Sequence, residues 1–196
     1  MLRALVALVA LVLAVGSSPT QLPGADAWLD QTTANWNRPE ASVPRAPVAE
    51  GAAQNLTRCG EAGRPPTLVA DRAVRAAGWT LFGPAQLFAA TTVVMAMADV
   101  DGMCRPLRYQ AFVFVDGRFA GTLSPVPMDS RTDGALGAVR LFRAAEMVAD
   151  FARYTSTDAL CCPSRTSTVT YGIERSPRGP VVHVISASTS PAPKLP

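Results

Sequence analysis

The segment Phe112–Leu123 reads FVFVDGRFAGTL, and it decides the fold. Two runs rich in aromatic and β-branched residues flank Asp116-Gly117, and a two-residue hairpin turn needs such a pair because both residues must tolerate positive φ. Upstream, the apolar run Ala89–Ala98 predicts a buried strand, followed by a polar loop and by the first strand of the hairpin at residues 107–115. The sequence therefore predicts three antiparallel strands that follow one another almost continuously.

More strands are predicted after this meander. Residues 138–142 follow a turn at Asp133-Gly134 and predict a short strand. Apolar and polar residues alternate over residues 167–173, a turn follows at residues 176–179, and residues 181–185 then return as a last strand. The C-terminal part is therefore expected to form a second hairpin.

Two short helices are predicted beside the strands. Over residues 67–77 the apolar side chains lie on one helical face opposite Asp71, with Thr67 as the cap and Gly78 at the end. Over residues 144–151 apolar side chains recur at i, i+3, i+4 and i+7, which is typical of a helix lying on a sheet. The expected fold class is α+β: an antiparallel β-sheet, made of a meander and a C-terminal hairpin, with two short helices packed on it and stapled by disulfides.

The N-terminus has the pattern of a secretory signal peptide. A short positive start at Arg3 precedes residues 4–15, which carry no polar side chain. This run is shorter than the roughly 20 apolar residues of a membrane span, so no transmembrane span is expected after signal removal. Cleavage after Gly16 and cleavage just before Trp28 both remain open. The first cysteine is Cys59, so no lipid anchor is expected near the cleavage point, and the chain is expected in the periplasm, in the cell envelope or secreted.

Export determines how the four cysteines are interpreted. An oxidising compartment favours bridges over free thiols or zinc ligands in a small domain. Pairing Cys161 with Cys162 requires a strained eight-membered ring between neighbours, so the two connectivities that join both Cys59 and Cys104 to this pair are favoured, without a choice between them. Each such bridge closes a long loop, worth on the order of 3 to 5 kcal/mol. No metal is expected here, because no CxxC spacing exists.

Composition and charge fit one globular domain. The net charge of +3 is small and the arginines are scattered, so nucleic acid is not expected as a partner. We predict a signal peptide at residues 1–27, a Pro-rich arm or linker at 28–66, a single domain at 67–186 and a disordered tail at 187–196. The chain is expected to be a monomer whose envelope or extracellular partner is unknown.

No catalytic constellation is visible. The single histidine, His183, alternates with valines in a predicted strand, and no G-x-S-x-G motif supplies a nucleophile. Four aspartates lie in loops where turn chemistry alone explains them, although together they permit calcium binding or acid-base catalysis. They are Asp99, Asp101, Asp129 and Asp133. No enzyme activity and no cofactor are therefore expected.

Several short motifs resemble a known family. The segments VDGMC, GTLSP and SRTDG, and an Arg-Tyr pair before CCPS, occur in this order in the LppP/LprE lipoprotein family. They are Val100–Cys104, Gly121–Pro125, Ser130–Gly134, Arg153-Tyr154 and Cys161–Ser164. The resemblance covers roughly residues 79–173. It implies a bacterial extracytoplasmic protein of unknown function, and this chain departs from the family in lacking a cysteine for lipid attachment.

The expected function is that of a non-catalytic binding or interaction module. The candidate ligand loop spans residues 125–134, and its residues of interest are Ser124, Pro125, Arg131 and Asp133. Arg131 can bind a carboxylate or phosphate, although an internal pairing with Asp133 is favoured. The alternative is an envelope hydrolase or a calcium-binding module that uses the acidic loops.

Overall fold

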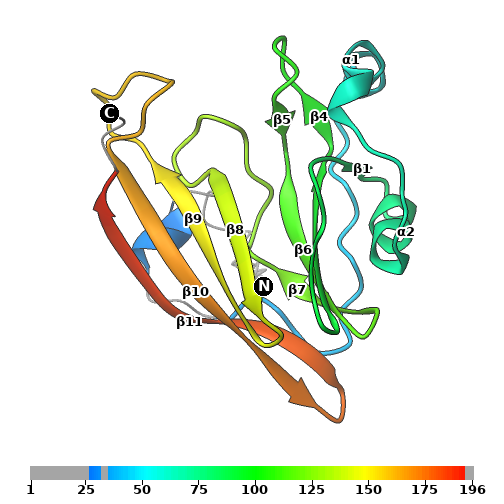
Figure 1. Cartoon of the computed structure of the whole chain (residues 1–196). Coiled ribbons are helices and arrows are strands. Elements are labelled where there is room, and N and C mark those ends of the chain that lie inside the picture. Colours follow the sequence, from blue (N-terminus) through cyan, green and yellow to red (C-terminus); the bar gives the residue numbers. More distant parts are fainter. Residues whose placement is uncertain (1–26, 32–34, 193–196) are drawn as a thin grey trace, which may run out of the picture.

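The computed structural model describes residues 27–31 and 35–192, and its strands form two antiparallel sheets and a small ribbon (Figure 1). The first sheet has the order β1-β3-β6-β7, with β2 also paired to β3; the second has the order β11-β10-β9-β8, and β4 pairs with β5. The elements are η1 (Ala27–Asp30), α1 (Ala52–Arg58), η2 (Gly60–Ala62), α2 (Val69–Ala76), β1 (Thr80–Leu81), β2 (Gln86–Phe88), β3 (Thr91–Met97), β4 (Asp99–Val100), β5 (Pro106–Leu107), β6 (Gln110–Val115), β7 (Arg118–Thr122), β8 (Leu136–Arg143), β9 (Glu146–Arg153), β10 (Arg165–Ser176) and β11 (Gly179–Pro191). The predicted α+β class with its meander and C-terminal hairpin is confirmed, and the strands are divided between two sheets.

The predicted central hairpin is present. Asp116 and Gly117 have φ values of 50° and 74°, so both adopt the left-handed conformation that the turn requires. The pairing of β6 with β7 shifts its register between Val113 and Phe114. Such a bulge bends the strand, so β6 and β7 diverge from a flat ribbon.

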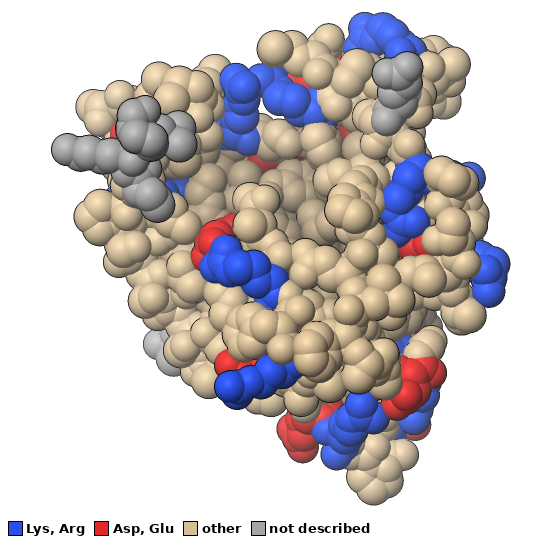
Figure 2. All heavy atoms as spheres, in the orientation of Figure 1, with Lys and Arg blue, Asp and Glu red and all other residues tan. Residues whose placement is uncertain are grey.

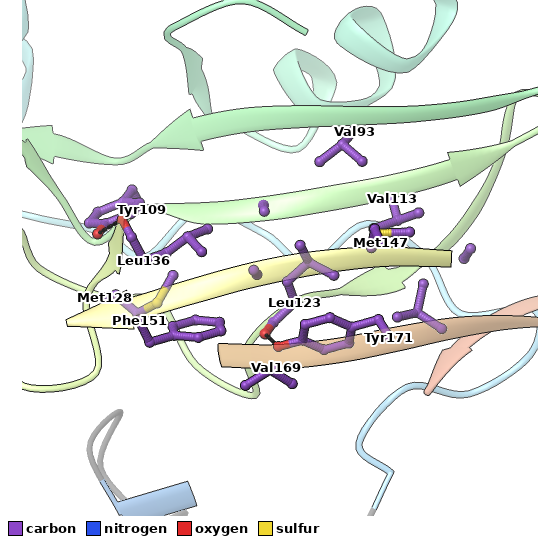
Figure 3. Packing of buried hydrophobic residues seen from close by; sticks show 14 of the residues in the cluster. Val93, Tyr109, Val113, Leu123, Met128, Leu136, Met147, Phe151, Val169 and Tyr171 are labelled. Atoms are coloured by element: carbon purple, nitrogen blue, oxygen red, sulfur yellow. Dashed lines mark hydrogen bonds between the residues drawn. The ribbon is translucent and has the colours of Figure 1, made fainter. Parts of the chain in front are cut away.

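The main hydrophobic core lies between the two sheets. On β6, Val113 points into this core together with Met147 and Tyr171 of the second sheet, as Figure 3 shows. Phe112 and Phe114, one position away on the pleat, belong to a second cluster with α2 and Trp79. The molecule is thus layered as helix, sheet and sheet. On one face a hollow separates the sheets between β8 and β5 (Figure 2).

The predicted second helix is wrong, because residues 146–153 form strand β9. Met147, Ala149, Phe151 and Arg153 are all buried while the residues between them are half-buried, which is the period of a strand. Over a few residues the apolar positions fit both the helical period and the strand period. Ala149 is small and Arg153 is charged, so their buried positions hid the alternation from a reading based on hydrophobicity.

Helix α2 is present, but the predicted cap at Thr67 is wrong. The carboxylate of Asp71 has no exposed surface and accepts hydrogen bonds from the backbone N–H groups of Thr67 (2.9 Å) and Leu68 (3.0 Å). Arg64 pairs with it at 2.5 and 2.8 Å. Asp71, rather than Thr67, therefore satisfies the start of the helix. Gly78, with φ 94°, ends it as predicted.

The disulfide connectivity differs from the two favoured pairings. The bridges are Cys59–Cys104 and Cys161–Cys162. Helix α1 packs beside β4, with the amide of Asn55 donating to Asp99 at 3.2 Å, and this places the Cα atoms of Cys59 and Cys104 5.5 Å apart. The loop between β9 and β10, which carries the other two cysteines, lies on the opposite side of the molecule (Figure 1). Distance therefore excludes the predicted pairings, and all four cysteines are bridged.

The Pro-rich segment lies against the domain. Its residues 35–49 have no regular structure, yet Asn37 is buried and bridges both sheets, donating to Thr122 O of β7 (3.0 Å) and to Val182 O of β11 (3.2 Å). Further along, Pro44 O accepts a hydrogen bond of 2.7 Å from the Trp79 indole. Trp28 of η1 is also buried, 5.2 Å from the ring centre of Phe151. This arm is therefore part of both cores.

The C-terminal strand is longer than predicted. Strand β11 runs to Pro191 and pairs with β10 as far as Arg165, so residues 187–191 are not a tail. Residues 193–196 and the predicted signal peptide up to residue 26 lie outside the described residues. Within the described part of the chain, no helix has the length and apolar character to cross a membrane.

Candidate functional site

The four residues of the predicted ligand loop do not come together. Ser124 is buried, and its hydroxyl donates to Val126 O at 2.8 Å, so it serves the loop itself. Pro125 lines a groove under the Pro-rich arm. Arg131 is exposed and has a φ of 63°. Asp133 forms an ion pair with Arg153. The loop borders two different hollows rather than forming one site.

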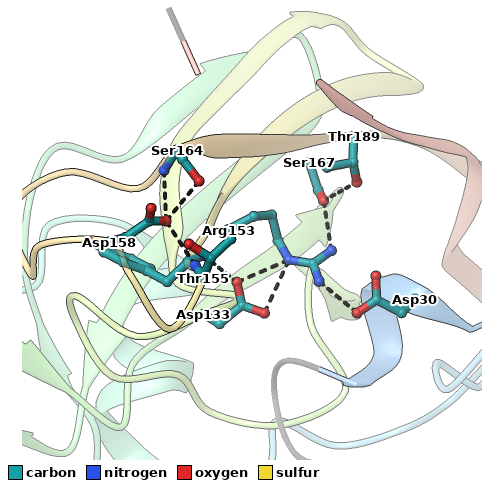
Figure 4. Close-up of polar contacts among 9 residues, drawn as sticks. Asp30, Asp133, Arg153, Thr155, Asp158, Ser164, Ser167 and Thr189 are labelled. Atoms are coloured by element: carbon teal, nitrogen blue, oxygen red, sulfur yellow. Dashed lines mark hydrogen bonds and ion pairs between the residues drawn. The ribbon is translucent and has the colours of Figure 1, made fainter. Parts of the chain in front are cut away.

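Asp133 pairs with Arg153 and not with Arg131, so the favoured internal pairing is wrong. Arg153 is buried, and its Nε lies 3.1 and 3.2 Å from the two carboxylate oxygens of Asp133 (Figure 4). Its Nη2 donates to Asp30 at 2.6 Å and its Nη1 to Ser167 at 3.1 Å. The hydrogen bond from Arg153 lowers the pKa of Asp30 below its ordinary value. This Arg153 cluster joins the loop, the second sheet and η1, and every one of its groups is engaged.

Each aspartate of the acidic loops has its own partner within the protein. Asp99 accepts from the Asn55 amide, Asp101 pairs with Arg105, and Asp129 accepts from the backbone N–H of Arg108 at 2.7 Å. Among the described residues, no three side chains of His, Cys, Asp or Glu gather where they could hold a metal ion. The four aspartates therefore fulfil local turn and ion-pair roles.

His183 lies half-buried on β11, opposite Gly172 of β10. A Cβ at Gly172 would lie 2.8 Å from two atoms of the imidazole ring, so the ring covers the glycine. Packing of the ring over Gly172 explains this histidine structurally.

The hollow seen in Figure 2 is a cleft between the edges of the two sheets. It has a volume of about 330 Å³. Phe82 and Tyr109 meet edge to face in its lining, with ring centres 5.9 Å apart. The other lining residues come from β2, β3, β5, β8 and the loops beside them: Gly83, Pro84, Gln86, Met95, Pro106, Ser130, Leu136, Gly137, Ala138 and Val139. We call this the inter-sheet cleft.

The polar side chains of the inter-sheet cleft are bonded to the protein backbone. Tyr109 donates to Leu136 O at 2.8 Å, and burial raises the pKa of its hydroxyl. Ser130 donates to Pro106 O at 2.7 Å. The Gln86 amide donates to Val139 O at 2.6 Å and accepts from Leu141 N at 3.0 Å, so it joins β2 to the edge of β8. The cleft therefore offers a ligand apolar and polar surface in nearly equal parts.

A second hollow lies under the Pro-rich arm and has a volume of about 510 Å³. Trp36 and Trp79 line it, and the Trp36 indole donates to Thr122 O at 3.2 Å. Pro125 and Pro127 form part of its wall. Sequence reasoning missed both hollows, because their linings come from segments far apart in the chain. The only sequence signal for these hollows was the Trp and Pro content of residues 28–66.

Comparison with known proteins supports the resemblance found from the motifs. Residues 85–176 match the model of the family described as LppP/LprE lipoprotein. No curated protein and no solved structure gives a significant match. A match to a lipoprotein family indicates an extracytoplasmic, envelope-associated protein.

Proposed function

We propose, on the premise that residues 85–176 match the LppP/LprE lipoprotein model, that the chain is a non-catalytic extracytoplasmic module that binds the apolar part of a small ligand in the inter-sheet cleft. The observation that carries the proposal is the cleft itself. Its volume of about 330 Å³ lies within the usual range of ligand sites, and most of its lining lies inside the matched region.

The lining suits a ligand that has an apolar part beside polar groups. Side chains such as Phe82, Met95 and Val139 supply the surface, while the polar groups of Gln86 and Tyr109 are already hydrogen-bonded within the protein. Burial of hydrocarbon is worth about 25 cal/mol per Å², so such a lining rewards an apolar group. A polar group buried there without a hydrogen-bond partner would cost free energy.

The rim of the cleft suits a negatively charged head group. Figure 2 shows Arg side chains bordering the hollow, with acidic side chains beside some of them. Arg131 is exposed and follows Ser130, which lines the cleft. A hydrocarbon chain that carries a carboxylate matches both the lining and the rim.

Binding of a fluorescent long-chain fatty acid to the full exported protein tests this function. Val139→Glu places a charge in the apolar lining and should weaken binding at least about tenfold. Phe142→Glu is the matched control, because Phe142 lies on the same strand, is 44% exposed and is not part of the lining. Circular dichroism establishes that both variants are folded.

The outcomes separate the parts of the proposal. Equal affinity of the two variants and the wild type would place the fatty acid elsewhere and refute the site. Arg131→Glu should weaken binding of the fatty acid but not that of the corresponding alcohol, because only the acid carries charge. Absence of any saturable binding would refute the proposed ligand class.

A further inference from the structure

The two disulfides differ in burial and in the length of chain that they close. Cys59 is 5% exposed within the main core, and its bridge to Cys104 spans 45 positions. Cys161 and Cys162 are both exposed and adjacent in sequence. A cross-link stabilises a fold mainly by restricting the unfolded chain, and this effect almost vanishes when the closed loop contains no further residue. Folding stability therefore accounts for the first bridge and not for the second.

The loop that carries Cys161 and Cys162 is held at its base without their help. One carboxylate oxygen of Asp158 accepts from Thr155 N (2.8 Å), Ser164 N (3.0 Å) and Ser164 Oγ (2.8 Å), as Figure 4 shows. These bonds hold the pKa of Asp158 far below its ordinary value. The strands β9 and β10 are thus joined by a loop whose base is closed by hydrogen bonds outside residues 159–163, which carry the bridge.

We propose that Cys161–Cys162 is a reversible redox site whose reaction partner is an extracytoplasmic dithiol. Exposed disulfides are the labile ones in proteins, whereas buried structural bridges resist reduction. Both cysteines are exposed to an approaching thiolate, and neither lies in a strand of either sheet. The proposal is independent of the inter-sheet cleft, which lies between the sheets and not at this loop.

The reaction is a thiol–disulfide exchange in two steps. A thiolate of the dithiol attacks one sulfur of the bridge, forms a mixed disulfide with it and releases the other cysteine as a thiolate. The second thiol of the partner then attacks the mixed disulfide, and the partner leaves as a disulfide. Two electrons and two protons pass to Cys161 and Cys162. An oxidised partner restores the bridge by the reverse steps.

Opening the bridge changes the tip of the loop. Leu160 is 71% exposed there, and its carbonyl accepts a hydrogen bond of 3.1 Å from the Tyr154 hydroxyl. Pro163 lines a hollow of about 400 Å³ on the open face of the second sheet, together with Asp150 and Thr168. On this proposal, a change of redox state acts on residues at the edge of this surface.

Differential alkylation of the oxidised, exported protein tests the proposal. The native protein is treated with increasing dithiothreitol, alkylated with iodoacetamide, digested and analysed by mass spectrometry. Cys161 and Cys162 should become alkylated at a dithiol concentration at least about tenfold below that needed for Cys59 and Cys104. Simultaneous reduction of both bridges, or earlier reduction of Cys59–Cys104, would refute a selective redox site. A peptide that links Cys59 or Cys104 to Cys161 or Cys162 would also refute it.

A double variant distinguishes a redox role from a structural one. Cys161→Ser combined with Cys162→Ser should unfold within about 1 °C of the wild type, because the bridge closes no long loop. Hydrogen exchange of the selectively reduced wild type should rise at residues 159–163 and stay unchanged in β9 and β10. A large loss of thermal stability in the variant, or exchange that spreads into the strands, would show that the bridge is structural.

Discussion

Arg153 is charged although its side chain is almost completely buried. Its side chain is 4% exposed and contacts Asp30 and Asp133, which are 64% and 24% exposed. Arg153→Met should lower the free energy of unfolding by about 2 to 4 kcal/mol, since it removes the positive partner of both carboxylates but leaves Asp30 able to hydrate. Urea unfolding followed by tryptophan fluorescence measures this loss.

Arg143 supplies the control for this prediction. It pairs with Glu146 at 3.4 Å, but its side chain is 72% exposed. Arg143→Met should change stability by less than about 0.5 kcal/mol, as for most surface ion pairs. If the two variants were equally stable, the Arg153 cluster would contribute no more than a surface pair does.

Residues whose type is restricted by turn geometry were predicted better than charged residues that are buried. Asp116 and Gly117 were identified because turn geometry restricts the choice of residues. Arg153 was missed because no local pattern indicates that a charge is buried; its partners come from positions 30 and 133. The same reason explains why the pairing of Asp133 was assigned to its neighbour Arg131.

At the scale of elements, the start of helix α2 depends on the ionised form of Asp71. Burial opposes ionisation, but hydrogen bonds from Arg64, Leu68 and Thr67 outweigh it and hold the pKa of Asp71 far below its ordinary value. The folded-state pKa is thus depressed below the unfolded value of about 3.9. The stabilisation is therefore fully present above about pH 5 and is lost progressively as the pH falls through 4 towards the folded-state value.

Asp71→Asn should remove this pH dependence. At pH 7 the variant should be less stable than the wild type by about 1 to 3 kcal/mol, because the amide cannot accept the same set of hydrogen bonds. The difference should shrink at pH 3, where the wild type begins to lose its own contribution. Urea unfolding at both pH values measures it. A stability difference that is constant between pH 7 and pH 3 would contradict the assignment to ionisation.

Elements were predictable where one periodicity dominated. The strands of the meander and of the C-terminal hairpin follow from β-branched runs and turn residues. Strand β9 was mistaken for a helix because Met147 and Phe151 fit both periods, and the small Ala149 gave no signal between them. Helix α1 was not predicted, because none of its residues is buried and its sequence carries no apolar stripe.

At the scale of the whole molecule, the Cys59–Cys104 bridge should carry most of the disulfide stabilisation. It closes a loop of 45 positions between α1 and the segment after β4. Cys104→Ser should lower the free energy of unfolding by about 3 to 4 kcal/mol in the chain-entropy model. Thermal unfolding with and without reductant measures the effect, and identical transitions in the wild type would show that this bridge does not stabilise the fold.

The candidate sites depend on contacts that only the assembled molecule provides. Of the predicted ligand-loop residues, Pro125 lines the hollow under the arm, whereas Asp133 pairs with the buried Arg153. The inter-sheet cleft itself was not predictable, because it forms where β8 of one sheet approaches β2 of the other. Likewise, the arm was recognised by its prolines, but the buried position of Asn37 follows only from the meeting of β7 and β11.

The Gln86 amide also bears on aggregation. Strand β8 lies at the edge of its sheet, and unpaired backbone groups on such an edge can recruit a strand from another molecule. Gln86 occupies Val139 O and Leu141 N, which an incoming strand would need. Gln86→Leu should therefore leave the monomer folded but promote edge-to-edge self-association, visible as concentration-dependent growth in light scattering. On this prediction, the hydrogen bonds of one side chain protect the open edge of β8 from pairing with another molecule.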